Sequence, residues 1–147
     1  MNLILRPIDK ENWKVCAKLE VNPEQREYVA SNPFSLAQAA YEPDHALWGI
    51  YDGERMVGFS MTSIDREQSP AHHWISRFMI DRREQGKGYG KAAFKLVADS
   101  LLSAYGCKEL RLSVHPANAN AIHVYEAYGL RATGEILDGE QVMRLQV

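Results

Sequence analysis

The sequence is poor in cysteine: Cys16 and Cys107 lie far apart, with no Cys-x-x-Cys pair and no cysteine–histidine metal spacing. This pattern excludes a disulfide framework and the common zinc motifs, so two reduced thiols are expected. Long apolar runs are also missing. The N-terminal segment has three consecutive apolar residues before a charge, far fewer than a signal peptide or a membrane span requires. We expect a cytoplasmic protein without a membrane partner.

An excess of positive charge is missing as well, since the formal net charge is −2. A chain without a global basic field is not expected to bind nucleic acid. There is no repeat or low-complexity tract. A length of 147 residues, with 46% hydrophobic and 24% charged residues, suits one globular domain over 1–147.

What the sequence does contain is a glycine-rich segment, Gln85-Gly-Lys-Gly-Tyr-Gly-Lys91, between an apolar strand ending near Ile80 and an amphipathic helix over 89–105. Glycines allow a backbone to approach a ligand closely. The unpaired N–H groups at a helix start point outward, with the positive end of the helix dipole behind them. The segment therefore predicts an anion-binding loop; the alternative is a loop that merely turns the chain.

The flanking charges indicate that the anion is a phosphate, because residues 82–95 carry five cations against one acid, Glu84: Arg82, Arg83, Lys87, Lys91 and Lys95. Two common nucleotide loops do not fit. The dinucleotide fingerprint needs a third glycine where Lys91 stands, and the Walker A loop needs a Gly-Lys-Ser/Thr sequence that is absent.

Two motifs carry a family resemblance. Gln85-x-x-Gly88-x-Gly90 resembles the pyrophosphate-binding loop of the GCN5-related N-acetyltransferases (GNAT), and Asn118-Ala-Asn-Ala-Ile-His-Val-Tyr-Glu-Ala-Tyr-Gly-Leu130 resembles that family's Asn-x-x-Ala-x-x-x-Tyr-x-x-x-Gly-Phe segment, with Leu130 for the final Phe. The resemblance implies an acetyl-CoA-dependent N-acetyltransferase, a transferase of the acyltransferase class. It also implies cofactor contacts from Phe78, Met79, Ile80, Gln85, Gly86, Lys87, Gly88, Tyr89, Gly90, Lys91, Asn118 and Tyr125.

The resemblance further implies that Tyr125 is catalytic and protonates the leaving thiolate. Helical geometry agrees with a shared ligand, because Asn118 and Tyr125 are seven residues apart, about two turns, and face the same side. The alternative is that Tyr125 is a core aromatic residue whose hydroxyl is satisfied elsewhere.

The order of elements predicts an α/β fold with a mixed central sheet. Asp52-Gly53 and Asp138-Gly139 are hairpin turns, and the strand that follows the 89–105 helix requires a parallel partner. In the GNAT fold the sheet is splayed at the cofactor site. Strands are expected at 3–8, 45–51, 55–64, 72–80, 109–114, 131–137 and 141–145, and short helices at 23–30, at 35–41 with Ser35 as the cap, and from 117 or 118.

A narrower resemblance, to bacterial polyamine acetyltransferases, lies in Trp74-Ile-x-Arg-Phe-Met-Ile-Asp81 and in a run at 24–32. Residues 20–54 carry one base, Arg26, and seven acids: Glu20, Glu24, Glu27, Glu42, Asp44, Asp52 and Glu54. Carboxylates attract polycations, so Glu24 and Glu27 are candidate substrate-binding residues for spermidine or spermine. The alternative is a solvated acidic surface.

The general base is not assigned, because Ser76 stands where some polyamine-acetylating relatives have a glutamate. His72, Glu20, Glu24 and Glu27 remain candidates acting through water. The leading function is acetyl transfer to a small primary amine by direct attack in a ternary complex. The alternatives are a protein or peptide N-acetyltransferase and a non-catalytic acyl-CoA sensor. The sequence does not give the oligomeric state, and a homodimer, common among relatives, is one possibility.

Overall fold

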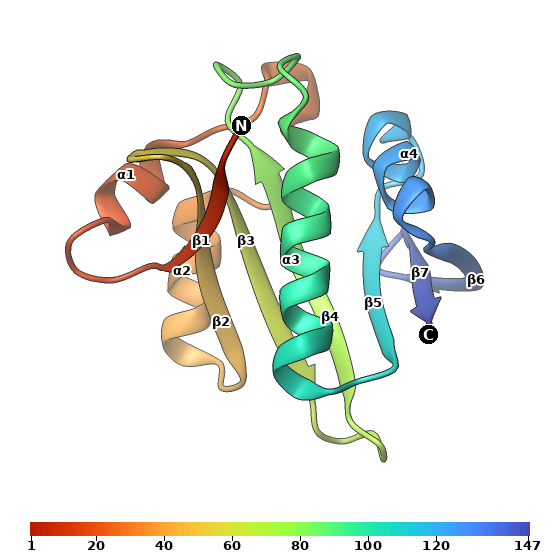
Figure 1. Cartoon of the computed structure of the whole chain (residues 1–147). Helices are drawn as coiled ribbons and strands as arrows, with labels where there is room; N and C mark the ends of the chain where they lie inside the picture. The colour runs from red at the N-terminus through yellow and green to blue at the C-terminus, as the bar shows by residue number, and fades with distance from the viewer.

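A computed structural model describes residues 1–147, which form a seven-stranded mixed sheet in the order β1-β2-β3-β4-β5-β7-β6 (Figure 1). The α/β fold predicted from the order of elements is confirmed. The strands are β1 (Leu3–Pro7), β2 (His45–Asp52), β3 (Arg55–Asp65), β4 (His72–Ile80), β5 (Glu109–Val114), β6 (Arg131–Leu137) and β7 (Glu140–Gln146). The helices are α1 (Trp13–Lys18), the 3-10 turn η1 (Pro23–Gln25), α2 (Asn32–Tyr41), α3 (Tyr89–Tyr105) and α4 (Ala119–Tyr128).

Both predicted hairpins are present. Their turn glycines, Gly53 and Gly139, have the positive φ angles, 62° and 80°, that such tight turns require. Strands β1 to β4 are antiparallel throughout, as are β5, β7 and β6. Only the junction between β4 and β5 is parallel.

Helices cover the two faces of the sheet in separate groups. Helix α3 lies across one face, and α1 and α2 lie on the other (Figure 1). The apolar stripe of α3 explains its position: Phe94, Val97 and Leu101 are buried in a 16-residue core with strand residues such as Leu110 and Leu112. A second core of 7 residues lies under α1 and α2.

The sheet splays between β4 and β5. Their ladder contains one paired position, Trp74 opposite Arg111, so the two strands diverge toward the end of β4. A register shift in the β3–β4 ladder leaves Ser76 without a partner, which is the pattern of a β-bulge. This splay confirms the expected opening of the sheet near the glycine-rich loop.

The two short helices expected before β2 were placed incorrectly. Only Pro23–Gln25 is helical within 23–30, and α2 begins at Asn32 rather than after Ser35. Ser31 is the N-cap, since its hydroxyl accepts a hydrogen bond from the Phe34 N–H, while Ser35 is buried inside the helix. Proline is compatible with a first helical turn, so Pro33 does not interrupt α2.

None of the helices combines the length and apolar composition needed to cross a bilayer.

Candidate active site

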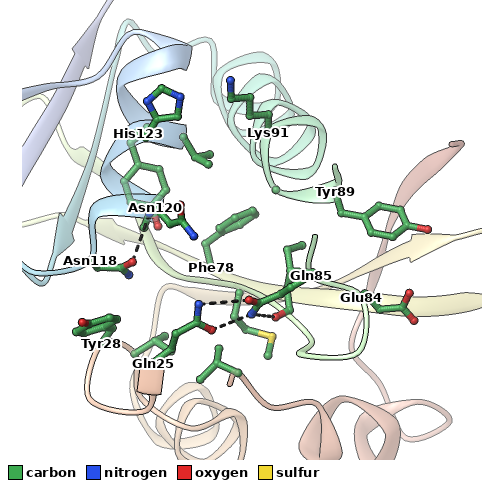
Figure 2. Close-up of a pocket in the computed structure, with 18 of the residues that line it drawn as sticks. Gln25, Tyr28, Phe78, Glu84, Gln85, Tyr89, Lys91, Asn118, Asn120 and His123 are labelled. Atoms are coloured by element: carbon green, nitrogen blue, oxygen red, sulfur yellow. Dashed lines mark hydrogen bonds between the residues drawn. The ribbon is translucent and has the colours of Figure 1, made fainter. Parts of the chain in front are cut away.

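A cavity of about 410 Å³ opens where β4 ends, between the starts of α3 and α4 and under the segment that follows α1 (Figure 2). Ten of the twelve predicted cofactor residues line it: Phe78, Met79, Ile80, Gln85, Gly88, Tyr89, Gly90, Lys91, Asn118 and Tyr125. Gly86 and Lys87 do not line it, and the Lys87 ammonium is paired with Glu84 at 3.0 Å. We refer to this space as the cofactor cavity.

The glycine-rich loop has the geometry of an anion cradle. Gly86 and Gly88 have φ angles of 78° and 87°, in the left-handed region that favours glycine, and Gly88 is the N-cap of α3. Glycine has no side chain to cap a helix, so the first N–H groups of α3 receive no hydrogen bond from a capping side chain at Gly88. These N–H groups and the helix dipole suit a phosphate group, so the loop fits the pyrophosphate of a coenzyme A donor.

Gly90 differs from the other two glycines because its φ angle is not left-handed. A Cβ atom built on Gly90 would lie 3.8 Å from Val124 Cγ2, which is ordinary van der Waals contact. The protein itself therefore has room for a side chain at this position. Space for a ligand is the remaining reason for a glycine there.

Most of the cations predicted to attract phosphate are already paired within the protein. Four of the five form ion pairs: Arg82 with Glu20, Arg83 with Asp81, Lys87 with Glu84 and Lys95 with Asp99. Lys91 forms none and lines the cofactor cavity. In Figure 2 the Lys91 side chain on α3 faces His123 on α4 across the opening. Lys91 is therefore the loop cation that remains available to a ligand.

Two predicted cofactor residues have side chains that anchor the loop. The Gln85 side chain exchanges hydrogen bonds with Gln25 at 2.9 and 3.3 Å and donates to the Ile80 carbonyl at 3.0 Å. The Tyr89 side chain points away from the cavity (Figure 2). Its hydroxyl donates a hydrogen bond to the Asp52 carboxylate and accepts one from the Arg55 guanidinium. At Tyr89, the group suited to a ligand is the backbone N–H.

Tyr125 lies on the face of α4 that points toward the sheet, and its ring packs against Phe94 with centroids 4.8 Å apart. Its side chain is buried, and its hydroxyl makes no hydrogen bond to another protein group. Burial, with a smaller effect of the Glu140 charge, raises the pKa of Tyr125 above the ordinary tyrosine range. The hydroxyl therefore keeps its proton at neutral pH and can donate it.

A second cavity of about 820 Å³, which we call the acceptor groove, lies against the cofactor cavity. Five residues line both spaces: Tyr28, Val29, Phe78, Asn118 and Tyr125. The groove continues from there between α2, the bulged part of β4, Ser113 on β5 and the β6–β7 turn. Tyr125 thus lies where two ligands, one in each space, would meet.

The acids predicted to attract a polycation are dispersed in the structure. Glu27 lines the acceptor groove, and Glu24 is exposed outside the lining of either cavity. Three others are paired with arginines: Glu20 with Arg82, Asp44 with Arg66 and Glu54 with Arg6. Three of the seven acids of 20–54 are therefore neutralised by arginines elsewhere in the chain.

Of the two strand positions considered for a general base, Ser76 and His72, only Ser76 lines the acceptor groove. The Ser76 hydroxyl lies 2.6 Å from the Ser63 hydroxyl at the floor of the groove, where neither provides a carboxylate. His72 lines neither cavity.

Four of the polar lining residues that sequence reasoning missed are relevant to the chemistry. Asn120 and His123 face the cofactor cavity from α4, and Arg77 and Glu140 line the groove. The helix that carries Tyr125 could have indicated the first two, because they lie within a turn of it or of Asn118. No local signal distinguishes Glu140, which reaches the groove only through the pairing of β7 with β5.

Comparison with known proteins gives the family. The family model for the acetyltransferase (GNAT) family matches residues 8–130, the greater part of the chain. The chain belongs to the GNAT family. It is also 31% identical, over 97% of each chain, to a spermine/spermidine N(1)-acetyltransferase of Bacillus subtilis (strain 168). It is 30% identical, over the same share, to a probable spermine N(1)-acetyltransferase of Bacillus subtilis subsp. natto.

Solved GNAT structures share the fold. A spermidine N-acetyltransferase from Vibrio cholerae, in complex with CoA and spermine, superposes with a TM-score of 0.74 at 17% identity and covers 99% of this chain and 94% of that chain. An aminoglycoside acetyltransferase in complex with coenzyme A and kanamycin gives a TM-score of 0.82 at 16% identity, with 99% and 95% covered. These structures show the shared fold. The match to the acetyltransferase (GNAT) family model and the 31% identity to an N-acetyltransferase make the chain an acetyl-CoA-dependent N-acetyltransferase, with acetyl-CoA as the cosubstrate.

Proposed function

We propose that this chain, acting as one domain over 1–147, transfers the acetyl group of acetyl-CoA to a primary amine of spermidine or spermine. One observation carries the proposal: Tyr125 lies at the junction of a phosphate-suited cofactor cavity and a separate groove whose lining includes Glu27, Asp65, Asp138 and Glu140. Carboxylates in such a groove favour a cationic acceptor. The 31% identical relative, a spermine/spermidine N(1)-acetyltransferase, supports the same class of acceptor.

The residues divide the work between the two spaces. The N–H groups at the start of α3 and the Lys91 ammonium bind the anionic end of acetyl-CoA, which supplies the activated acetyl thioester when bound. The backbone N–H and C=O groups of β4 at Phe78 to Ile80 bind the extended arm of the cofactor as a neighbouring strand would. Tyr125 donates a proton to the sulfur as the acetyl group leaves.

Direct attack by the amine is favoured over a cysteine-linked route. Cys16 is buried in the second core, where burial raises the pKa of its thiol to about 12. Neither Cys16 nor Cys107 lines the cofactor cavity or the groove. A protonated thiol away from the junction cannot accept the acetyl group there, so donor and acceptor meet in a ternary complex.

The proposal is tested by acetyl-CoA turnover over a panel of polyamines, aminoglycosides, monoamines and short peptides. Spermidine or spermine is expected to give the highest kcat/KM. A far higher value with peptides would replace the polyamine assignment by protein or peptide acetylation. Tight acetyl-CoA binding without turnover of any amine would favour an acyl-CoA sensor.

Glu27 is expected to bind the distal charges of a polyamine, because it is the predicted substrate carboxylate that lines the groove. Changing Glu27→Gln should raise the KM for spermidine several-fold and the KM for a monoamine less. Only a polyamine has a second ammonium group, whose contact with the Glu27 carboxylate is lost. Glu24→Gln is the matched control, because Glu24 is exposed outside both cavities. Equal effects on both amines would remove Glu27 from acceptor recognition.

We further propose a cytoplasmic homodimer that pairs through β6. All seven residues of this edge strand are exposed, including Ile136 at 62% and Leu137 at 44%. An exposed apolar edge strand favours pairing with another chain. Light scattering coupled to gel filtration should give twice the chain mass, and Ile136→Lys should give the monomer mass. A wild-type monomer at micromolar concentration would contradict the dimer.

A further inference from the structure

Glu140 is a carboxylate held at a defined point of the acceptor groove. It is the first residue of β7, directly after the Asp138-Gly139 turn, and it is half-buried. The Ser113 hydroxyl on β5 donates a 2.8 Å hydrogen bond to its Oε1 atom. The β5–β7 ladder fixes this contact, because Ser113 is opposite Val142 and Val114 is opposite Gln141.

The carboxylate of Glu140 is incompletely satisfied. Its Oε2 atom accepts no hydrogen bond from the protein, and no lysine or arginine forms an ion pair with it. Arg77 also lines the groove, but its guanidinium donates to Gln38 Oε1 and to the Ser76 carbonyl and pairs with no carboxylate. A half-buried carboxylate with an unused oxygen is suited to a cation that arrives with the substrate.

The charge of Glu140 acts at the junction of the two cavities. Burial raises the pKa of Tyr125, and the negative charge of Glu140 raises it further. Burial lowers the pKa of Arg77, and the Glu140 charge acts in the opposite direction. Glu140, Tyr125 and Arg77 all line the acceptor groove, which agrees with an effect of the Glu140 charge on both residues.

The other carboxylates of the groove are less suited to the transfer point. Asp65 accepts a hydrogen bond from the Glu67 N–H and lies at the far end of β3. Glu27 and Asp138 are exposed. Glu140 is the one that a side-chain hydrogen bond fixes and whose charge reaches Tyr125.

We propose that Glu140, oriented by Ser113, binds the ammonium group of the acceptor beside Tyr125 and takes up the proton that this group must lose before attack. The inference rests on the proposed function for the presence of an amine acceptor, and it assigns the base that the serine at position 76 cannot provide. Glu140 lies at the start of β7, whereas Ser76 lies on β4.

The protons balance in this scheme. The ammonium group gives one proton to the Glu140 carboxylate, and the free amine forms a C–N bond to the thioester carbonyl carbon. The C–S bond breaks as the Tyr125 hydroxyl gives its proton to sulfur, and the extra proton on the nitrogen returns to Tyr125. Glu140 then releases its proton to water, so an ammonium ion and acetyl-CoA become an acetamide, coenzyme A and one proton.

Several other charged groups face the same space and enter any pH dependence. Tyr125 lines this groove from α4 and Arg77 lines it from β4. The remaining titratable and charged groups around the groove are Asp138, Glu27, Arg26, Tyr28, Asp65 and His45.

The test compares Glu140→Gln with Glu135→Gln, a matched change of an exposed residue on the neighbouring strand that lines neither cavity. Two measurements are made: calorimetric binding of spermidine to the CoA-loaded protein, and the pH profile of kcat/KM with the amine that the wild type acetylates best. In Glu140→Gln, amine affinity and kcat/KM at neutral pH should each fall about ten-fold or more, because a charge-assisted contact and a base are lost. The KM for acetyl-CoA should stay unchanged.

The pH profile separates a base from a structural residue. In the Glu140→Gln variant, kcat/KM should keep rising as pH approaches the amine pKa of about 10.4, because more of the acceptor arrives already deprotonated. Glu140→Asp should recover part of the loss, and Ser113→Ala should give a smaller loss of the same kind. A substitution that only disturbed packing would lower kcat/KM by the same factor at every pH.

The outcomes distinguish this inference from the proposed function. Wild-type preference for a non-polyamine amine overturns the polyamine assignment, and the Glu140 comparison then proceeds with that amine. Glu140→Gln matching Glu135→Gln in amine affinity and in pH profile overturns the role of Glu140, whichever amine is used. Absence of amine binding by the wild type overturns both.

Discussion

Changing Gly90→Ala should weaken acetyl-CoA binding about ten-fold or more while leaving the fold at least as stable. The added methyl group meets only Val124 Cγ2, at 3.8 Å, so the protein accommodates it. Gly90 lies in the first turn of α3, where alanine is favoured over glycine by roughly 0.5–1 kcal/mol. The same methyl group enters the cofactor cavity, where crowding of about 1–3 kcal/mol opposes a bound phosphate group.

Calorimetry with acetyl-CoA and thermal unfolding of the free protein together provide the measurement. Gly106→Ala is the matched control at the other end of α3, because Gly106 has a φ angle of 57° and an added Cβ atom there meets nothing within 4 Å. That variant should lose stability through backbone strain and keep its cofactor affinity. Unchanged acetyl-CoA affinity in Gly90→Ala would show that the pyrophosphate does not lie against residues 86–91.

Gly88 gives a less specific test of the same site. Its φ angle of 87° makes any side chain there strained, so a loss of affinity in a Gly88 variant could arise from a distorted loop. A Gly88→Val, Gly90→Val double variant is still expected to lose binding. Only the Gly90→Ala variant separates ligand space from backbone strain.

Features set by neighbouring residues could be predicted from the sequence. The bounds predicted for α3, 89–105, match the structure because its apolar stripe, its glycine-rich start and Gly106 at its end are all local signals. Both hairpin turns were predicted for the same reason. Tyr125 and Asn118 were identified through the resemblance of 118–130 to the GNAT segment, which is itself a local pattern, and Asn118 is the N-cap of the helix that carries Tyr125.

Features that depend on distant parts of the chain could not be predicted. The arginine at position 82 is separated by 62 residues from Glu20, its ion-pair partner, so a count of local charges overstated the free positive charge near the loop. The acidic excess of residues 20–54 was overstated in the same way. Glu140 lies close to Ser113 only because β7 inserts between β5 and β6 in the sheet, and hydrophobic periodicity does not specify that order.

Changing Tyr125→Phe should lower the rate of acetyl transfer about 10²-fold or more and leave acetyl-CoA affinity unchanged. The ring keeps its packing on Phe94, while the hydroxyl, which has no partner within the protein, is lost. Because burial and the Glu140 charge raise the pKa of Tyr125, the wild-type hydroxyl is protonated throughout the neutral range. The variant should therefore be slower at every neutral pH, with no shift in the profile.

Tyr128→Phe is the matched control, since Tyr128 is on the same helix and also packs against Phe94, but its hydroxyl donates to Asp99 and it lines neither cavity. That variant should lose some stability and keep its rate. Single-turnover experiments with preloaded acetyl-CoA isolate the transfer step, so slow release of product cannot mask the effect. If Tyr125→Phe transferred the acetyl group at the rate of Tyr128→Phe in that experiment, the proton on the leaving sulfur would have to come from another group, and among the lining residues His123 on α4 would be the next to replace.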